Sequence, residues 1–553
     1  MNLPKKDLSC PSSFCTICTD KCKRDLILWV LTLSIQHNGA KVYIMCDKSS
    51  KEAIDELTPD MNKQLNITWL IELDKYSGKT RAEMEKEEIW SEFLKNKMDI
   101  MLFALKKEKD TLFLDSDIMI LDKLNGINHD KVLGVSPQFI KDENVKKVGY
   151  YNAGFLWTNN KNVCEYWKEI IEPNHSCAEQ IHMEKLTKKY DHFEFGENYN
   201  LQTWRFIIGK EDSKTIASNI KITTEGKLYY KTNPLKCIHT HFNDERFKDI
   251  NKLFMIKLAK ARYYKELSCI YRAINNKWII KMPGQPRKGI WNHKNDSFRE
   301  LALLYKQNLK DVDLYTDDNN GHCWLVPQII LYDRPTLEWI DDSVKKCGLL
   351  LLGNCDEDKE GVELRKVNIN AKPWIFWPRK PMVVEKILKK NKILDWDERD
   401  CETIFIGNIE NSIQDMYGND TDLEWEKVLT EYHCTKGLKH KFSQEEYLDK
   451  IRKSKYGLCL RGYGSKCHRE IECMAFGTVP IITPKVCIKS FINPPSEGIH
   501  YIRGNNPDDL MRKLKNIGEK RWKSMSMAAS KWYMENVHSS GSWNTTIQYI
   551  LYK

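Results

Sequence analysis

Short apolar runs alternate with longer helical stretches over the first ~250 residues of a chain whose 553 residues are too many for one hydrophobic core. Apolar runs at 14–19, 41–46 and 111–114 predict strands, and residues 23–37, which Asn38-Gly39 follow, predict a helix. A long helical stretch at 81–107 precedes the third strand. This alternation predicts an α/β fold with a βαβ opening and a mainly parallel, Rossmann-like sheet covered by helices.

A second alternating pattern occupies the rest of the chain. Residues 250–297 are helical and basic, with a loop-like Pro/Gly stretch at 282–286. Strand-like runs then occur at 348–352, 403–406, 456–460 and 479–482. With a break near 396–402, the pattern predicts an N-terminal domain at 1–255, a helical linker at 256–297, and two Rossmann-like lobes at 298–398 and 399–553.

Charge and hydropathy narrow the classes of partner. The net charge of +10 is a small excess of 87 basic over 77 acidic residues, so we expect small anionic substrates and no nucleic-acid partner. The longest apolar run near the N-terminus, residues 26–33, is far shorter than the ~20 residues of a membrane span. We therefore expect a soluble, cytoplasmic protein without a transmembrane segment. The sequence leaves its oligomeric state open.

The first candidate site is an acidic pair directly after a predicted strand. Asp115 and Asp117 follow the apolar run at 111–114 and precede a second one at 118–121. Ligands of open α/β sheets bind beyond the carboxyl ends of the strands, where this pair falls. Paired carboxylates can hold Mg²⁺ or Mn²⁺, and such an ion neutralises the diphosphate of a nucleotide sugar.

Residues 111–118 and 151–155 resemble segments of the GT-A sugar-nucleotide transferases, in particular the glycogenin-like group and related enzymes of large DNA viruses. The resemblance implies that Asp115 and Asp117 bind Mn²⁺ or Mg²⁺ and that a histidine at 236–242 completes the metal shell. Strand alternation lets His239 and His241 face the same side, and the family pattern favours His241.

Further positions follow from the same resemblance. The donor-sugar pocket would be lined by Asn152, Ala153 and Gly154, and Glu179-Gln180 would lie near the anomeric carbon as catalytic candidates. Asp47, after the second strand, and Arg81 or Lys97, in the helical stretch, are placed to meet the base and the diphosphate.

The second candidate site is a strand–glycine loop–helix–strand segment at 456–482. We expect a helix to begin after Ser465, where its free N–H groups would meet phosphate. Glycines such as Gly464 allow close approach, while Arg461, Lys466 and Arg469 supply charge. The segment resembles the nucleotide-binding lobe of exostosin-type GT-B glycosyltransferases, which implies that Glu472 binds the ribose.

Two such modules predict a bifunctional glycosyltransferase, which uses UDP- or GDP-sugar donors to extend a glycan or glycoprotein acceptor. The first site would depend on metal and the second would not. One alternative is a single GT-A transferase with a non-catalytic glycan-binding or docking half. Another is a sugar nucleotidyltransferase, although residues 18–22 lack the glycine-rich loop typical of that class. If the source is viral, the location would be the host cytoplasm.

Overall fold

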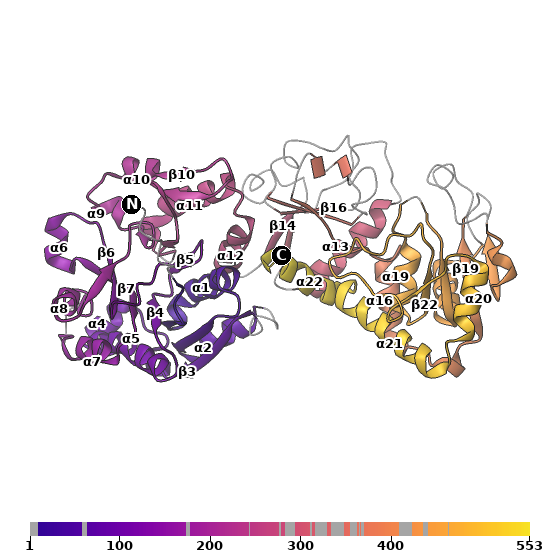
Figure 1. Cartoon of the computed structure of the whole chain (residues 1–553), viewed down its shortest axis with the longest axis horizontal. Helices are drawn as coiled ribbons and strands as arrows, with labels where there is room; N and C mark the ends of the chain where they lie inside the picture. The colour runs from indigo at the N-terminus through magenta and orange to yellow at the C-terminus, as the bar shows by residue number, and fades with distance from the viewer. Residues whose placement is uncertain are drawn as a thin grey trace. The chain divides into compact units, whose positions relative to one another are not determined.

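The computed structural model describes residues 9–57, 64–172, 177–242, 244–275, 278–281, 294–309, 312–315, 329–332, 348–353, 362–363, 365–366, 370–408, 423–434, 441–462 and 464–552. The chain divides into two compact units, Met1–Trp278 and Ile279–Lys553, called unit 1 and unit 2 below. Figure 1 labels their elements.

A seven-stranded sheet forms the centre of unit 1, in the order β3-β2-β1-β4-β7-β6-β8. Its strands are β1 (Ser13–Cys18), β2 (Lys41–Cys46), β3 (Asn66–Ile71), β4 (Thr111–Leu114), β6 (Leu133–Pro137), β7 (Tyr151–Thr158) and β8 (His192–Glu194). The strands from β3 to β4 are parallel, and β7 is antiparallel to both β4 and β6. This sheet confirms the predicted mixed α/β class with a mainly parallel sheet.

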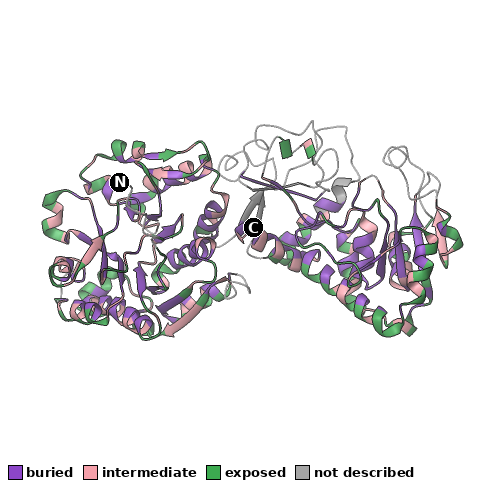
Figure 2. Cartoon of the chain, viewed as in Figure 1, coloured by how far each residue is buried: buried purple, intermediate pink, exposed green. Residues whose placement is uncertain are grey.

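Helices cover the sheet because its central strands are apolar on both faces. Strands β1, β4 and β7 are buried along their whole length, as Figure 2 shows in purple. Helix α5 (Trp90–Leu105) packs on β1, β2 and β4, and α1 (Lys23–Gln36) packs against α12 (Tyr264–Asn275). The other helices of unit 1 are α2 (Lys48–Asp55), α4 (Arg81–Lys86), α6 (Asp142–Val148), α7 (Lys161–Glu169), α8 (Met183–Lys189), α9 (Arg205–Ile208), α10 (Ser213–Asn219) and α11 (Lys248–Lys260).

Residues 81–107, predicted as a long helical stretch, form two helices that are separated at Glu88. Thr80 begins α4 with a capping box to Glu83, and Glu88 then adopts a left-handed backbone with φ 62°. A non-glycine residue in that conformation cannot continue a helix, and α5 therefore starts afresh at Trp90.

Two small sheets complete unit 1. One pairs β5 (Ile118–Ile120) and β9 (Leu201–Gln202) on either side of β13 (Cys237–His239). The other joins β10 (Ile220–Ile222), β11 (Leu228–Tyr230) and β12 (Asn233–Pro234). Because His239 lies opposite Ile118 and beside Gln202, the first of these sheets brings the histidine segment to the acidic pair.

Unit 2 contains two five-stranded sheets, ordered β15-β14-β16-β17-β18 and β20-β19-β21-β22-β23. The first consists of β14 (Trp278–Lys281), β15 (Val312–Tyr315), β16 (Ile329–Tyr332), β17 (Leu349–Leu352) and β18 (Ala371–Pro373). The second consists of β19 (Cys401–Gly407), β20 (Glu431–Cys434), β21 (Ser454–Cys459), β22 (Val479–Ile482) and β23 (Ile502–Arg503), and all of its pairings are parallel. The described helices of unit 2 are α13 (Lys294–Asn308), α16 (Pro381–Lys390), α18 (Gln444–Arg452), α19 (His468–Ala475), α20 (Pro507–Lys515), α21 (Glu519–Asn536) and α22 (Ser539–Tyr552).

A buried arginine ties the second sheet to its neighbours. The Arg399 guanidinium is buried just before β19, and burial lowers its pKa to about 10. It donates hydrogen bonds to the carbonyl oxygens of Leu394, Arg452, Ser454 and Phe476 and to the hydroxyl of Thr478. Three stretches of the chain, around residues 394–399, 452–454 and 476–478, therefore meet at one side chain.

The predicted linker lies partly in unit 1. Helix α12, within the predicted linker at 256–297, packs on α1, and Gln36 donates a hydrogen bond to Glu266. Residues 282–293 of the linker, with its Pro/Gly stretch, lie outside the described residues. The boundaries of the four predicted segments stay predictions.

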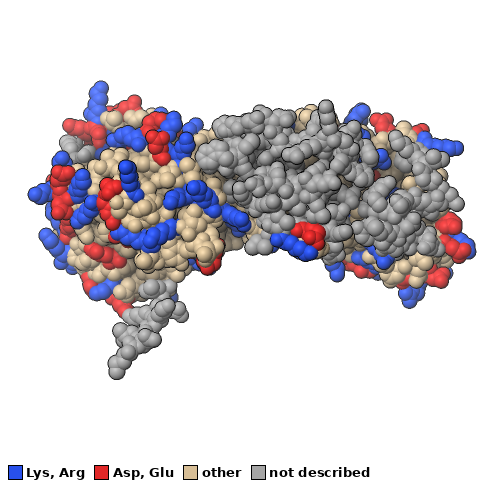
Figure 3. Space-filling model, turned by 90° about the horizontal axis from the view of Figure 1, so that it is seen from above, with Lys and Arg blue, Asp and Glu red and all other residues tan. Residues whose placement is uncertain are grey.

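Acidic and basic side chains are interspersed on the face of unit 1 that Figure 3 shows. This agrees with a net charge that is small relative to the number of charged groups. Within the described part of the chain, none of the helices is both long and apolar enough to cross a bilayer.

Candidate functional site

The acidic pair forms the turn between β4 and β5, at the carboxyl end of β4. The Asp115 backbone N–H donates to the Gly154 carbonyl at 2.8 Å, and the Asp117 carbonyl accepts from the backbone and the hydroxyl of Thr240 at 2.9 and 3.0 Å. The turn is thus attached to β7 on one side and to the segment after β13 on the other. Both carboxylates remain partly accessible.

Both predicted histidines lie against Asp117. His239 Nε2 is 2.8 Å from Asp117 Oδ1, and His241 Nε2 is 3.7 Å from Asp117 Oδ2. The imidazole rings stack with centroids 4.5 Å apart, and one ligand atom from each of the three side chains lies within 4.8 Å of the others. Nitrogen and carboxylate donors at this spacing could hold a metal ion.

The electrostatics of this cluster agree with a cation-binding role. Burial raises the pKa of Asp117, but the two imidazoles lower it more, so the net pKa is well below its usual value. Burial lowers the pKa of His241, whereas the Asp117 carboxylate raises the pKa of His239 against the effect of burial. A bound metal ion would take the place of the proton that a charged imidazole carries, because imidazole ligates metal in its neutral form.

His241 is held in place by its backbone and by Thr203. Its φ of 47° is in the left-handed region, which is strained for a residue with a side chain. Its Nδ1 is 2.9 Å from Thr203 Oγ1, which leaves Nε2 directed at Asp117. Thr203 was not among the predicted residues. It follows β9, and only the pairing of β9 with β13 reveals it.

Asp115 contacts a cationic side chain in place of the histidines. Lys97, buried on α5, lies 2.8 Å from Asp115 Oδ1 and 3.4 Å from Glu179 Oε1. Burial lowers the pKa of Lys97, but these two carboxylates raise it further, so the ammonium stays charged. Glu179 Oε2 is buried and has no hydrogen-bond partner among the described residues. The shared metal role of Asp115 and Asp117 stays a prediction.

The predicted sugar-pocket residues form a polar network around Gln180. Its side-chain oxygen accepts from Asn152 Nδ2 at 3.2 Å and from the Ala153 backbone at 3.3 Å. Asn152 Oδ1 in turn accepts from the Gly154 backbone and from Asn200. Sequence reasoning missed Asn200, because its loop carries no motif and joins the network only through the fold.

Asp47 and Arg81 have local partners in the structure. Asp47 caps α2 and accepts from the Ser50 and Asp20 backbones and the Ser77 hydroxyl. Burial raises the pKa of Asp47, but these hydrogen bonds lower it more. Arg81 pairs with Glu85 at 2.8 Å. Their predicted contacts with the base and the diphosphate stay predictions.

In unit 2 the helix of the second candidate site begins at His468, with Cys467 as its N-cap. We expected this helix to begin after Ser465, and it starts three residues beyond that serine. The intervening residues form a loop in which Gly464 is half-buried and Lys466 is buried. The Cys467 N–H donates to Glu470, whose side chain completes the capping box that fixes this start.

The charged residues of this segment contact unit 2 itself. Glu472 is 1% exposed and accepts from the Arg379 backbone at 3.0 Å and from the Tyr447 hydroxyl at 2.7 Å. Arg469 donates to the Ile406 carbonyl, and Lys466 donates to the Gly353 carbonyl. Burial raises the pKa of Glu472. Its predicted ribose contact stays a prediction.

No protein-family model and no curated protein matches the sequence. Among solved structures, the glycosyltransferase GlyE of Streptococcus pneumoniae TIGR4 aligns at 12% identity and a TM-score of 0.30, over 66% of this chain and 92% of that one. Mouse xyloside xylosyltransferase 1 aligns at 10% identity and a TM-score of 0.28, over 42% of this chain and 98% of that one. The WbbM bifunctional glycosyltransferase aligns at 13% identity and a TM-score of 0.30, over 49% of this chain and 53% of that one. Similarity at this level assigns the chain neither a family nor an activity.

Proposed function

We propose that the chain is a glycosyltransferase whose first site, in unit 1, uses a UDP- or GDP-sugar with Mn²⁺ or Mg²⁺. The observation that carries the proposal is the Asp117–His239–His241 cluster at the carboxyl edge of a mainly parallel sheet. Beside the same turn are the Lys97–Asp115–Glu179 contacts and the Gln180 network. This combination supplies groups for metal, diphosphate and sugar.

The donor set fits a divalent ion. Asp117, His239 and His241 would hold it, with Asp115 as a further oxygen ligand. His239 Nε2, which lies 2.8 Å from Asp117 Oδ1, would be the nitrogen that binds the metal. A bound ion would neutralise the charge that develops on the departing nucleoside diphosphate.

The chain's own side chains would orient the reactants. Lys97 offers a positive charge beside the acidic pair, and the Asn152 and Gln180 amides offer hydrogen bonds to sugar hydroxyls. In the transfer, the bond between the anomeric carbon and the diphosphate oxygen breaks as the acceptor oxygen bonds to that carbon. We propose that Glu179, with its unpartnered Oε2, receives the acceptor proton in an inverting reaction or faces the sugar in a retaining one.

For unit 2 we propose a second, metal-independent donor site of the GT-B type. Its two five-stranded sheets support two Rossmann-like lobes, and the Arg461–Glu472 segment follows β21 at the carboxyl edge. The acceptor would be a growing glycan or glycoprotein. One observation favours the alternative of a non-catalytic glycan-binding or docking unit: both Glu472 oxygens already have protein partners.

Release of nucleoside diphosphate from a panel of UDP- and GDP-sugars by the full chain tests both sites. With Mn²⁺, Asp117→Asn should lower the part of the turnover that EDTA abolishes at least a hundredfold, by roughly 3 kcal/mol of transition-state stabilisation. Asp142→Asn, an exposed carboxylate on α6, is the matched control and should keep full activity.

Chelation separates the two modules. Turnover that persists in EDTA and is lost in Glu472→Gln supports a catalytic unit 2, whereas its complete loss in EDTA supports the docking alternative. A chain that neither binds nor hydrolyses any sugar nucleotide, with or without metal, is not a glycosyltransferase.

A further inference from the structure

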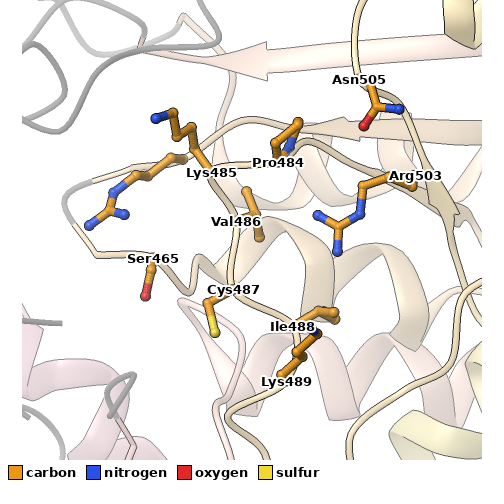
Figure 4. Close-up of a pocket in the computed structure, with 10 residues that line it drawn as sticks. Ser465, Pro484, Lys485, Val486, Cys487, Ile488, Lys489, Arg503 and Asn505 are labelled. Atoms are coloured by element: carbon orange, nitrogen blue, oxygen red, sulfur yellow. The ribbon is translucent and has the colours of Figure 1, made fainter. Parts of the chain in front are cut away.

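Unit 2 contains a pocket of about 520 Å³ beyond the carboxyl ends of β21, β22 and β23. Arg461 follows β21, Lys485 and Lys489 follow β22, and Arg503 ends β23. These strands are parallel neighbours, so residues far apart in sequence meet at one edge of the sheet. Figure 4 shows the Arg503 guanidinium directed toward the middle of the lining residues.

The lining of this pocket is strongly cationic. Arg461, Lys485, Lys489 and Arg503 all contribute, and none of the described residues that line it carries a carboxylate. Like charges that share a concave, partly desolvated space repel one another, and an anionic ligand would relieve that repulsion. A hydrogen bond of 2.8 Å from Arg503 Nη1 to the Thr483 carbonyl fixes the guanidinium in place.

A buried hydroxyl adds a neutral donor to the same pocket. Ser465 is 4% exposed, and its Oγ is buried without a hydrogen-bond partner in the part of the chain that the structure describes. An unpartnered buried hydroxyl is unfavourable unless a ligand satisfies it. Asn505 lines the same pocket with a side-chain amide.

Other charged residues of the second candidate site do not line the pocket. Lys466, Arg469 and Glu472 are absent from its lining, and each has a protein partner. The cationic pocket therefore has its own donors, independent of the predicted ribose contact.

We infer that this pocket binds a phosphoryl or diphosphoryl group without a metal ion. Arginine matches phosphate oxygens with two parallel N–H groups, and lysines add positive charge on long side chains. The volume is within the usual range of small-ligand sites, so a nucleoside diphosphate or a phosphorylated sugar would fit. The inference goes beyond the proposed function, because it holds whether or not unit 2 transfers sugars.

Titration calorimetry of the full chain in EDTA tests the inference, with inorganic diphosphate, UDP, GDP and glucose 6-phosphate as probes. At least one probe should bind, and added NaCl should weaken it. Lys489→Gln should weaken it roughly tenfold, as expected for the loss of one charge-assisted contact, and Arg503→Gln at least as much. Lys489 is exposed, so its replacement leaves the packing intact.

The matched controls separate charge from position. Lys489→Arg should keep the affinity, and Lys520→Gln, which removes an exposed charge outside the pocket, should leave it unchanged. If UDP or GDP binds at least tenfold more tightly than diphosphate, the ligand is a nucleotide. If glucose 6-phosphate binds most tightly of the probes, the ligand is a phosphorylated sugar.

The inference is overturned if no probe binds in EDTA, or if Lys520→Gln weakens binding as much as Lys489→Gln. Neither result would affect metal-dependent turnover in unit 1, so this inference and the proposed first site fail separately.

Discussion

Gly154 shows how one missing side chain leaves room for the Asp115 carboxylate. A Cβ at this position would lie 2.2 Å from Asp115 Oδ2 and 3.0 Å from Asn152 Oδ1. The Asp115 carboxylate thus occupies the space that any other residue would fill, because β4 and β7 are hydrogen-bonded neighbours.

Gly154→Ala should lower metal-dependent donor hydrolysis more than tenfold while the fold survives. The added methyl meets the end of a flexible side chain, so Asp115 would rotate away from Lys97, and a misplaced site group commonly lowers rates by about this factor or more. Steady-state turnover and circular dichroism check this. Gly518→Ala, with no atom within 4 Å of the new methyl, is the control; full activity in Gly154→Ala would show that Asp115 need not lie there.

Lys97→Met should lower the free energy of unfolding by about 1–3 kcal/mol. The change leaves Asp115 and Glu179 without their shared cation, and the cost is below that of a fully buried pair because the Asp115 side chain is 25% exposed. Urea denaturation measures it. Adding Glu179→Gln should recover part of the loss, whereas Lys95→Met on the same helix should change little; equal losses from both lysines would contradict this account.

At the scale of single residues, the sequence indicated which side chains lie at the candidate site better than it indicated which of them contact one another. His239 and His241 lie on one side with their rings stacked, as expected, although β13 ends at His239 and His241 has a left-handed backbone in place of the expected strand alternation. The sequence could not show that Asp117 contacts both histidines while Asp115 contacts Lys97, because that depends on how β4, β13 and α5 pack together. Thr203 and Asn200 carry no local pattern at all.

At the scale of elements, the α1–α12 contact contains a buried carboxyl. Glu266 is 5% exposed and accepts from Gln36, and burial raises its pKa to about 7. The folded chain thus retains a proton that the unfolded chain loses above its ordinary pKa of 4.5. Unfolding becomes easier as the pH rises between these two values.

Glu266→Gln should remove this pH dependence. At pH 8 the variant should be more stable than the wild type by up to about 3 kcal/mol, and near pH 4.5 the two should be similar. Glutamine keeps an acceptor for Gln36. Denaturation at both pH values measures the difference, with the exposed Glu245→Gln as control; a variant equally stable at pH 8 would mean that Glu266 ionises normally.

Elements were predicted well where hydrophobicity alone decides them. The strands at 41–46, 111–114 and 479–482 match β2, β4 and β22 residue for residue, because buried parallel strands are continuous apolar runs. The sequence pattern did not indicate the break at Glu88 or the residue at which α19 begins. A left-handed residue and a cysteine N-cap leave little trace in an apolar pattern.

At the scale of the whole molecule, the chain contains two compact units and two candidate sites of different charge. Unit 1 could offer carboxylates and imidazoles to a cation, whereas unit 2 could offer guanidinium and ammonium groups to an anion. The cationic pocket escaped prediction from sequence because Lys485, Lys489 and Arg503 come together only when three strands align.

Calorimetry should resolve two unfolding transitions that respond to different ligands. Mn²⁺ should raise the midpoint temperature of one transition, and inorganic diphosphate in EDTA should raise that of the other. Each shift should be several degrees when the ligand concentration is about a hundred times its dissociation constant. Asp117→Asn should abolish only the Mn²⁺ shift and Lys489→Gln only most of the diphosphate shift. One transition that both ligands move together would show that the units do not unfold separately.

Arg399 has a consequence for how unit 2 can diverge in evolution. Four of its five acceptors are main-chain carbonyls, which every residue type supplies. Neighbouring side chains can therefore drift freely while the arginine cannot, since lysine has no planar fork to reach several carbonyls at once. Distant homologues of unit 2 should retain this arginine just before a buried strand even after the surrounding sequence has become unrecognisable.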